Sequence, residues 1–79
     1  TALQNGIKCF SREYKGYFSA FSFSDSCSGV SEKGFKYLIE NVCLRNTEPV
    51  GVSNEFIGEE AEIEVKNGIL ILSYELLQA

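Results

Sequence analysis

The chain has 79 residues, of which 44% are hydrophobic and 23% are charged, with a formal net charge of −4. A chain of this length forms one small domain, so we expect residues 1–79 to share a single core. The absence of histidine excludes sites that need an imidazole, such as a Ser-His-Asp triad or a Cys2His2 zinc site. No apolar run approaches the roughly 20 residues that span a bilayer, so we expect no membrane segment.

The three cysteines, Cys9, Cys27 and Cys43, are widely spaced and form no Cys-x-x-Cys pattern. A structural zinc normally takes four ligands from Cys and His, and this chain offers only three. In reducing compartments an unpaired cysteine behaves as a small buried hydrophobe. We therefore expect no metal, no cofactor and a cytoplasmic location, with one disulfide plus a free thiol as the alternative.

Residues 7–24 carry aromatic residues on both sides of Lys15-Gly16, and apolar side chains fall on both faces of the two strands that they would form. Gly16 supplies the positive φ that a two-residue turn requires, and aromatic side chains favour a pleated surface. This segment predicts a β-hairpin in which Tyr14 lies opposite Tyr17.

Apolar residues recur at helical spacing over residues 32–45. Ser31 is a suitable N-cap, and Asn46 followed by Pro49 supplies the stop. The spacing i, i+3, i+4, i+7 and i+8, which places side chains on one helical stripe, is met by Phe35, Leu38, Ile39, Val42 and Cys43. We predict a helix here, followed by an irregular segment over 46–60 in which Val50 and Val52 form at most a short edge strand.

The last segment, residues 61–75, predicts a second β-hairpin. Residues 61–66 alternate strictly, Asn67-Gly68 is a preferred two-residue turn, and 69–74 form the returning strand. One face of this hairpin would be buried, formed by Ala61, Ile63, Val65, Leu70, Leu72 and Tyr74. Together the elements predict an α+β fold, a two-layer ββαββ arrangement whose antiparallel or mixed sheet is covered on one face by the single helix.

The negative charge is concentrated in the second half of the chain. Residues 46–79 contain one basic and seven acidic residues, whereas residues 1–45 have a slight positive excess. Such a field attracts basic surfaces and repels phosphates. We therefore expect a small acidic, non-enzymatic protein-binding module, in the manner of an inhibitor, immunity protein or antitoxin of a basic protein. The partner-binding residues would be Glu59, Glu60, Glu62, Glu64, Ile69 and Ile71.

The first hairpin supports an alternative, a binder of single-stranded nucleic acid. Cations interleaved with aromatic rings on a sheet contact phosphates and stack on bases, and the candidates are Lys8, Arg12, Tyr14 and Tyr17. A structural homodimer is the third possibility. No catalytic residue is predicted, because Cys27 has no histidine to activate it and no Gly-rich phosphate loop occurs.

Overall fold

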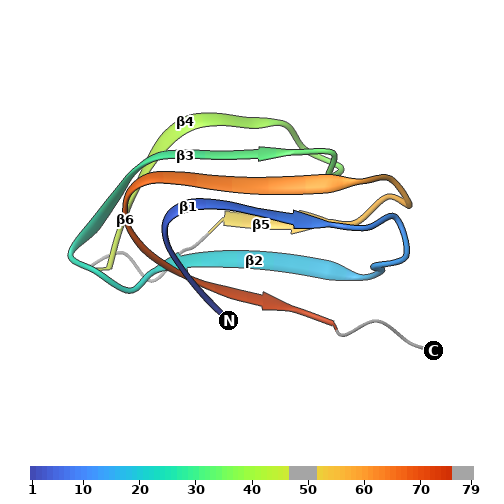
Figure 1. Ribbon diagram of the computed structural model, residues 1–79, viewed down its shortest axis with the longest axis horizontal. Helices are drawn as coiled ribbons and strands as arrows, with labels where there is room; N and C mark the ends of the chain where they lie inside the picture. The colour runs from blue at the N-terminus through green and yellow to red at the C-terminus, as the bar shows by residue number, and fades with distance from the viewer. Residues whose placement is uncertain (47–51, 76–79) are drawn as a thin grey trace.

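The protein is described by a computed structural model covering residues 1–46 and 52–75. These residues form six strands and no helix (Figure 1): β1 (Ala2–Phe10), β2 (Tyr17–Ser22), β3 (Ser26–Lys33), β4 (Ile39–Arg45), β5 (Val52–Glu55) and β6 (Ala61–Tyr74). The strands pair antiparallel in the order β4-β3-β6-β2-β5, and β1 also pairs with β6. Figure 1 shows this sheet curled around its interior, so the α+β ββαββ prediction is wrong. The described residues contain no helix that is long and apolar enough to cross a membrane.

The predicted helix over 32–45 is replaced by the end of β3, a loop and β4. Gly34 has a φ of +81° and Asn41 a φ of +51°, and a right-handed helix tolerates neither value. The apolar stripe is also split between two environments, because Phe35 is 5% exposed whereas Leu38 is 65% exposed. The helical spacing arose from two separate strands and the loop between them.

The predicted closing hairpin is instead one 14-residue strand, β6, which bends sharply where the turn was expected (Figure 1). The register against β1 shifts between Gln4 and Gly6, so that residues 66–68 lie opposite Asn5 alone. The burial pattern of β6 changes phase at this irregularity, because Val65 is buried before it and Leu70 is buried after it. The two halves of β6 therefore bury the side chains expected of the two hairpin strands, namely Ala61, Ile63, Val65, Leu70 and Leu72, with Tyr74 partly buried.

The predicted hairpin over 7–24 is wrong as well, because β1 and β2 do not pair. Phe10 at the end of β1 lies opposite Ala61 of β6, and Phe18 of β2 lies opposite Tyr74 at the other end of β6. Both β1 and β2 pair with the long strand β6 instead of with each other. Within the segment predicted to be irregular, 46–60, β5 forms an edge strand against β2, while Val50 lies outside the described residues.

The core at one end of the curled sheet consists of aromatic rings. Phe10, Phe18, Phe35 and Phe56 are each no more than 6% exposed, and the Phe18 and Phe35 ring centroids lie 4.6 Å apart. An isolated backbone bridge joins Phe35 to Phe56 and so fastens the loop between β3 and β4 to the end of β5. This loop, residues 34–38, positions the candidate site described next.

Candidate functional site

A single buried amide holds the 34–38 loop against β5. Asn54 of β5 is 3% exposed. Its Oδ1 accepts hydrogen bonds from the backbone N–H groups of Tyr37 (2.9 Å) and Glu55 (3.0 Å), and its Nδ2 donates to the Tyr37 carbonyl oxygen (2.8 Å) and to Glu32 Oε1 (3.0 Å). The amide thus uses both of its donor hydrogens and both acceptor positions within the protein. The backbone N–H of Lys36 adds a hydrogen bond to the Glu55 carbonyl oxygen at 2.9 Å.

The fastened loop and β5 form one side of an open cavity of about 270 Å³, which we call the β5 pocket. Its two tyrosines are largely exposed, Tyr17 by 74% and Tyr37 by 57%. The pocket is lined by Tyr17, Lys36, Tyr37, Ser53, Asn54 and Glu55. It therefore combines aromatic rings, a hydroxyl group, a carboxylate and an ammonium group at a site whose backbone is held by the Asn54 amide. The Lys36 ammonium group lies 5.6 Å from the centre of the Tyr37 ring.

The carboxyl group beneath this site has an unusual environment. Glu32 is fully buried, and its Oε2 has no hydrogen-bond partner among the described residues. Burial raises the pKa of Glu32 from its ordinary 4.5 to about 7, and the hydrogen bond from Asn54 opposes this increase. Glu32 is thus a buried carboxyl group that holds its proton to a higher pH than an ordinary glutamate does.

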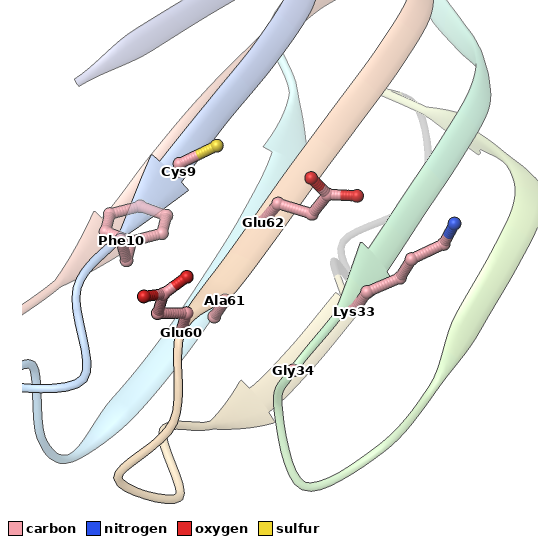
Figure 2. A pocket seen from close by; sticks show the side chains of 7 residues that line it. All are labelled: Cys9, Phe10, Lys33, Gly34, Glu60, Ala61 and Glu62. Atoms are coloured by element: carbon pink, nitrogen blue, oxygen red, sulfur yellow. The ribbon is translucent and has the colours of Figure 1, made fainter.

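A second cavity, of about 250 Å³, lies on the outer side of the sheet, and we call it the outer pocket (Figure 2). Glu62 of β6 is its central residue, with Cys9 of β1 and Lys33 of β3 as its two cross-strand partners. The complete lining is Cys9, Phe10, Lys33, Gly34, Glu60, Ala61 and Glu62. Apart from Phe10, which is 2% exposed, the outer pocket offers no aromatic ring.

The structure separates the residues predicted to bind a basic partner. Glu59 and Glu60 are exposed and precede β6, Glu62 and Glu64 are half-buried in its first half, and Ile69 and Ile71 follow its bend. Of these residues, Glu60 and Glu62 line the outer pocket, together with Lys33. The basic partner, the homodimer and the cytoplasmic location stay predictions, because no observation here bears on them.

The aromatic and basic face predicted for the first hairpin is dispersed. The Lys8 ammonium group lies 5.5 Å from the ring of Phe10, which is a core residue. Arg12 is exposed in the connection after β1, and Tyr14 packs on Phe10 with ring centroids 5.1 Å apart. Tyr17 of this set lines the β5 pocket.

Sequence reasoning missed the other residues of the β5 pocket. Tyr37 lay in the predicted helix, and residues 53–55 lay in the segment predicted to be irregular. The run Ser53-Asn54-Glu55 is short and polar, and no periodic pattern marks it as a strand. Within residues 1–46 and 52–75, no group of three or more His, Cys, Asp or Glu side chains is placed to hold a metal ion.

Solved structures of thiamin pyrophosphokinases resemble this fold over most of the chain. The thiamine pyrophosphokinase of Bacillus subtilis is 28% identical, with a TM-score of 0.78, and the match covers 96% of this chain and 37% of that one. The thiamin pyrophosphokinase of Geobacillus thermodenitrificans is 24% identical (TM-score 0.78; 91% and 34% covered), and a family member from Enterococcus faecalis is 20% identical (TM-score 0.71; 96% and 36% covered). The chain therefore spans about a third of the length of these structures. No curated protein matches the chain.

Residues 4–70 match the family described as thiamin pyrophosphokinase, vitamin B1 binding domain. This match overturns the expectation of a small acidic, non-enzymatic protein-binding module, because the family and the similar structures are those of an enzyme. It also replaces the inhibitor, antitoxin and nucleic-acid-binding interpretations. Since the matched segment covers most of its length, the chain belongs to the thiamin pyrophosphokinase vitamin B1 binding domain family.

Proposed function

We propose that this chain binds thiamin in the β5 pocket, as the thiamin-binding part of a thiamin pyrophosphokinase. The observation that carries the proposal is the exposure of Tyr17 and Tyr37 in one cavity with the carboxylate of Glu55. The family match and the similarity to solved thiamin pyrophosphokinases support it.

The chemistry of thiamin suits these groups. Thiamin joins an aminopyrimidine ring to a positively charged thiazolium ring. Aromatic faces attract cations and stack on flat rings, which gives Tyr17 and Tyr37 their role. The Glu55 carboxylate adds attraction for the positive charge, and the Ser53 hydroxyl supplies a hydrogen bond to the aminopyrimidine or to the alcohol of thiamin.

Asn54 has a different role in this proposal. All of its hydrogen-bonding capacity is used by Glu32, Tyr37 and Glu55, so nothing remains for a ligand. It fixes the backbone that carries Tyr37 and Glu55 before the ligand arrives. Such preorganisation reduces the entropy lost on binding.

The β5 pocket is small for a complete ligand site. Its volume of about 270 Å³ lies below the range of roughly 300–1,000 Å³ usual for small-molecule sites. We therefore assign to these residues one wall of the thiamin site. The remainder of the site and the phosphate chemistry are assigned to the part of the longer enzymes that this chain does not span.

Isothermal titration calorimetry of the chain with thiamin tests the proposal. We expect binding that weakens at least 10-fold in Tyr37→Ala, because the exposed ring supplies the stacking surface. A neutral aminopyrimidine without the thiazolium ring should bind more weakly than thiamin, since it lacks the charge attracted by Glu55.

The matched control is Phe23→Ala, which removes an aromatic ring that is 65% exposed and does not line the β5 pocket. This variant should bind thiamin as the original chain does. Equal losses in Tyr37→Ala and Phe23→Ala would show that thiamin does not bind at the β5 pocket.

A further inference from the structure

Glu32 connects two strands that lie on different sides of the curled sheet. It belongs to β3, whose sheet neighbours are β4 and β6, whereas Asn54 belongs to β5 at the far edge of the strand order. Their side chains meet in the interior, where Asn54 Nδ2 donates to Glu32 Oε1 at 3.0 Å. The second carboxyl oxygen, Oε2, is buried and accepts no hydrogen bond from the part of the chain that the structure describes. This contact is therefore a cross-link through the interior with half of the carboxyl group unsatisfied.

No charged group in the described residues compensates a negative charge at this position. The cross-strand partners of Glu32 are Ile39 on β4 and Ile63 on β6, and β5 presents only the neutral amide of Asn54. Lys33, the next residue in the chain, is exposed and lines the outer pocket. Burial and the Asn54 hydrogen bond are accordingly the two influences on the pKa of Glu32.

We propose that Glu32 is a positioning residue whose protonation state controls whether the 34–38 loop holds Tyr37 at the β5 pocket. With a neutral carboxyl group, Oε1 accepts from Asn54, and Asn54 in turn holds the backbone N–H and carbonyl groups of Tyr37. An ionised carboxylate is a buried charge without a counter-ion, which strongly favours any conformation that admits water.

The 34–38 loop is the route by which water reaches this carboxylate. It is fastened to β5 through Asn54, through the bond from Lys36 to Glu55 and through the Phe35–Phe56 bridge, whereas Tyr37 and Leu38 are exposed. Opening this loop breaks the hydrogen bonds of Asn54 and exposes Glu32. It also removes Tyr37 from the pocket.

Hydrogen exchange in the full 79-residue chain without ligand tests the proposal. A carboxyl group that titrates near 7 in the closed loop and near 4.5 in the opened loop makes opening about 100-fold more favourable at pH 8 than at pH 4.5. We expect the amides of Tyr37 and Glu55 to lose protection by about this factor, after correction for the intrinsic exchange rate. The amides of Gly68 and Ile69, at the bend of β6, should change far less.

Glu32→Gln is the informative variant, because glutamine keeps an oxygen acceptor for Asn54 and does not ionise. It should leave the protection of Tyr37 independent of pH. Glu40→Gln, at an exposed position on β4, is the matched control and should retain the pH dependence of the original chain. A protection loss shared equally by Gly68 and Tyr37, or one that persists in Glu32→Gln, would overturn the proposal.

A titration of the original chain keeps the proposal testable even if Glu32→Gln does not fold. Carbon NMR of the Glu32 carboxyl group should show a midpoint near 7, and a midpoint near 4.5 would overturn the proposal. A consequence for affinity, weaker thiamin binding above pH 7, rests on the proposed function. Because the exchange and NMR measurements contain no thiamin, a failure of thiamin binding and a failure of the Glu32 proposal are distinguishable.

Discussion

The β5 pocket and the outer pocket flank the same loop, residues 34–38, yet they are built differently. Gly34 lines the outer pocket, and Tyr37 lines the β5 pocket. Three side chains of the outer pocket stand on paired strands, with Glu62 between Cys9 and Lys33 (Figure 2). The β5 pocket depends instead on the hydrogen bond between Asn54 and Glu32 in the interior. The difference shows that the buried amide of Asn54 determines the position of the exposed residue Tyr37.

Replacing that amide should produce the largest effect. Asn54→Leu leaves two backbone N–H groups, one carbonyl group and the Glu32 carboxyl without their partner. We expect a loss of about 3–5 kcal/mol in the free energy of unfolding, because each buried unsatisfied polar group costs about 1–3 kcal/mol. Urea denaturation followed by circular dichroism measures this loss.

Ser53→Ala, next to Asn54 but exposed, is the control and should change the free energy of unfolding by less than about 0.5 kcal/mol. A loss below about 1 kcal/mol in Asn54→Leu would mean that the amide does not determine the position of the loop.

A substitution on the other side of the loop should have the next largest effect. Gly34 has a φ of +81°, and a Cβ at this position would overlap the Glu60 carbonyl oxygen. Gly58 has a φ of +80° but has no atom within 4 Å of such a Cβ. Gly58→Ala should cost about 1 kcal/mol for the backbone conformation alone, and Gly34→Ala about 3 kcal/mol.

Thermal unfolding of the two alanine variants separates two costs. Both variants place an alanine at a positive φ, and only Gly34→Ala also adds the steric overlap with the Glu60 carbonyl oxygen. Equal losses in Gly34→Ala and Gly58→Ala would indicate that the loop moves aside freely, contrary to its fastening at β5.

The alternation of apolar with other residues in 61–66 and 69–74 was sufficient to predict which side chains of β6 are buried. It was not sufficient to distinguish a hairpin from a single strand with a bulge. Both arrangements reverse the alternation near Gly68, so the same residues reach the core in each. The choice depends on pairing with β1, β2 and β3, which are distant in sequence.

The candidate site was even less accessible to sequence reasoning. Phe35 and Ile39 satisfy a helical spacing although one lies in a loop and the other on β4. Asn54 acquires its role only because the sheet curls and brings β5 opposite Glu32. A glutamate at position 32 reads as a solvated residue in the sequence, and its burial follows from tertiary structure alone.

The pH dependence of the free energy of unfolding tests the interaction between Glu32 and Asn54. Glu32 has a higher pKa in the folded chain, about 7, than in the unfolded chain, so the unfolded chain releases its proton first as the pH rises. The stability associated with its protonated form is complete below about pH 4.5 and is lost by about pH 7. Relative to Glu32→Gln, the original chain should therefore lose about 3 kcal/mol between pH 4.5 and pH 8.

Urea denaturation at these two pH values measures the difference between the original chain and Glu32→Gln. The subtraction removes the contributions of the other carboxyl groups, which both proteins share. Parallel stability curves for the two proteins would show that the Glu32 carboxyl group titrates as an exposed one does.

The smallest expected effect is on thiamin binding. It is measured by comparing substitutions of one carboxylate in each pocket. Glu55 lines the β5 pocket and Glu62 the outer pocket, and both are half-buried. Glu55→Gln should weaken thiamin binding about 3- to 10-fold, equivalent to about 1 kcal/mol, because it removes one attraction for the thiazolium charge. Glu62→Gln removes the same charge at a place without exposed aromatic rings, so it should leave the dissociation constant within about 2-fold of the original value.

Salt distinguishes a direct contact from the general negative field of the chain. The quantity to compare is the ratio of the thiamin dissociation constants of Glu55→Gln and the original chain. If Glu55 contacts the thiazolium ring directly, this ratio should fall only slightly from low to moderate ionic strength, because nearby charges are poorly screened. A long-range field would affect both variants alike and would disappear with salt. Equal, salt-sensitive losses in Glu55→Gln and Glu62→Gln would therefore remove the distinction between the two pockets on which the assignment of the thiamin site depends.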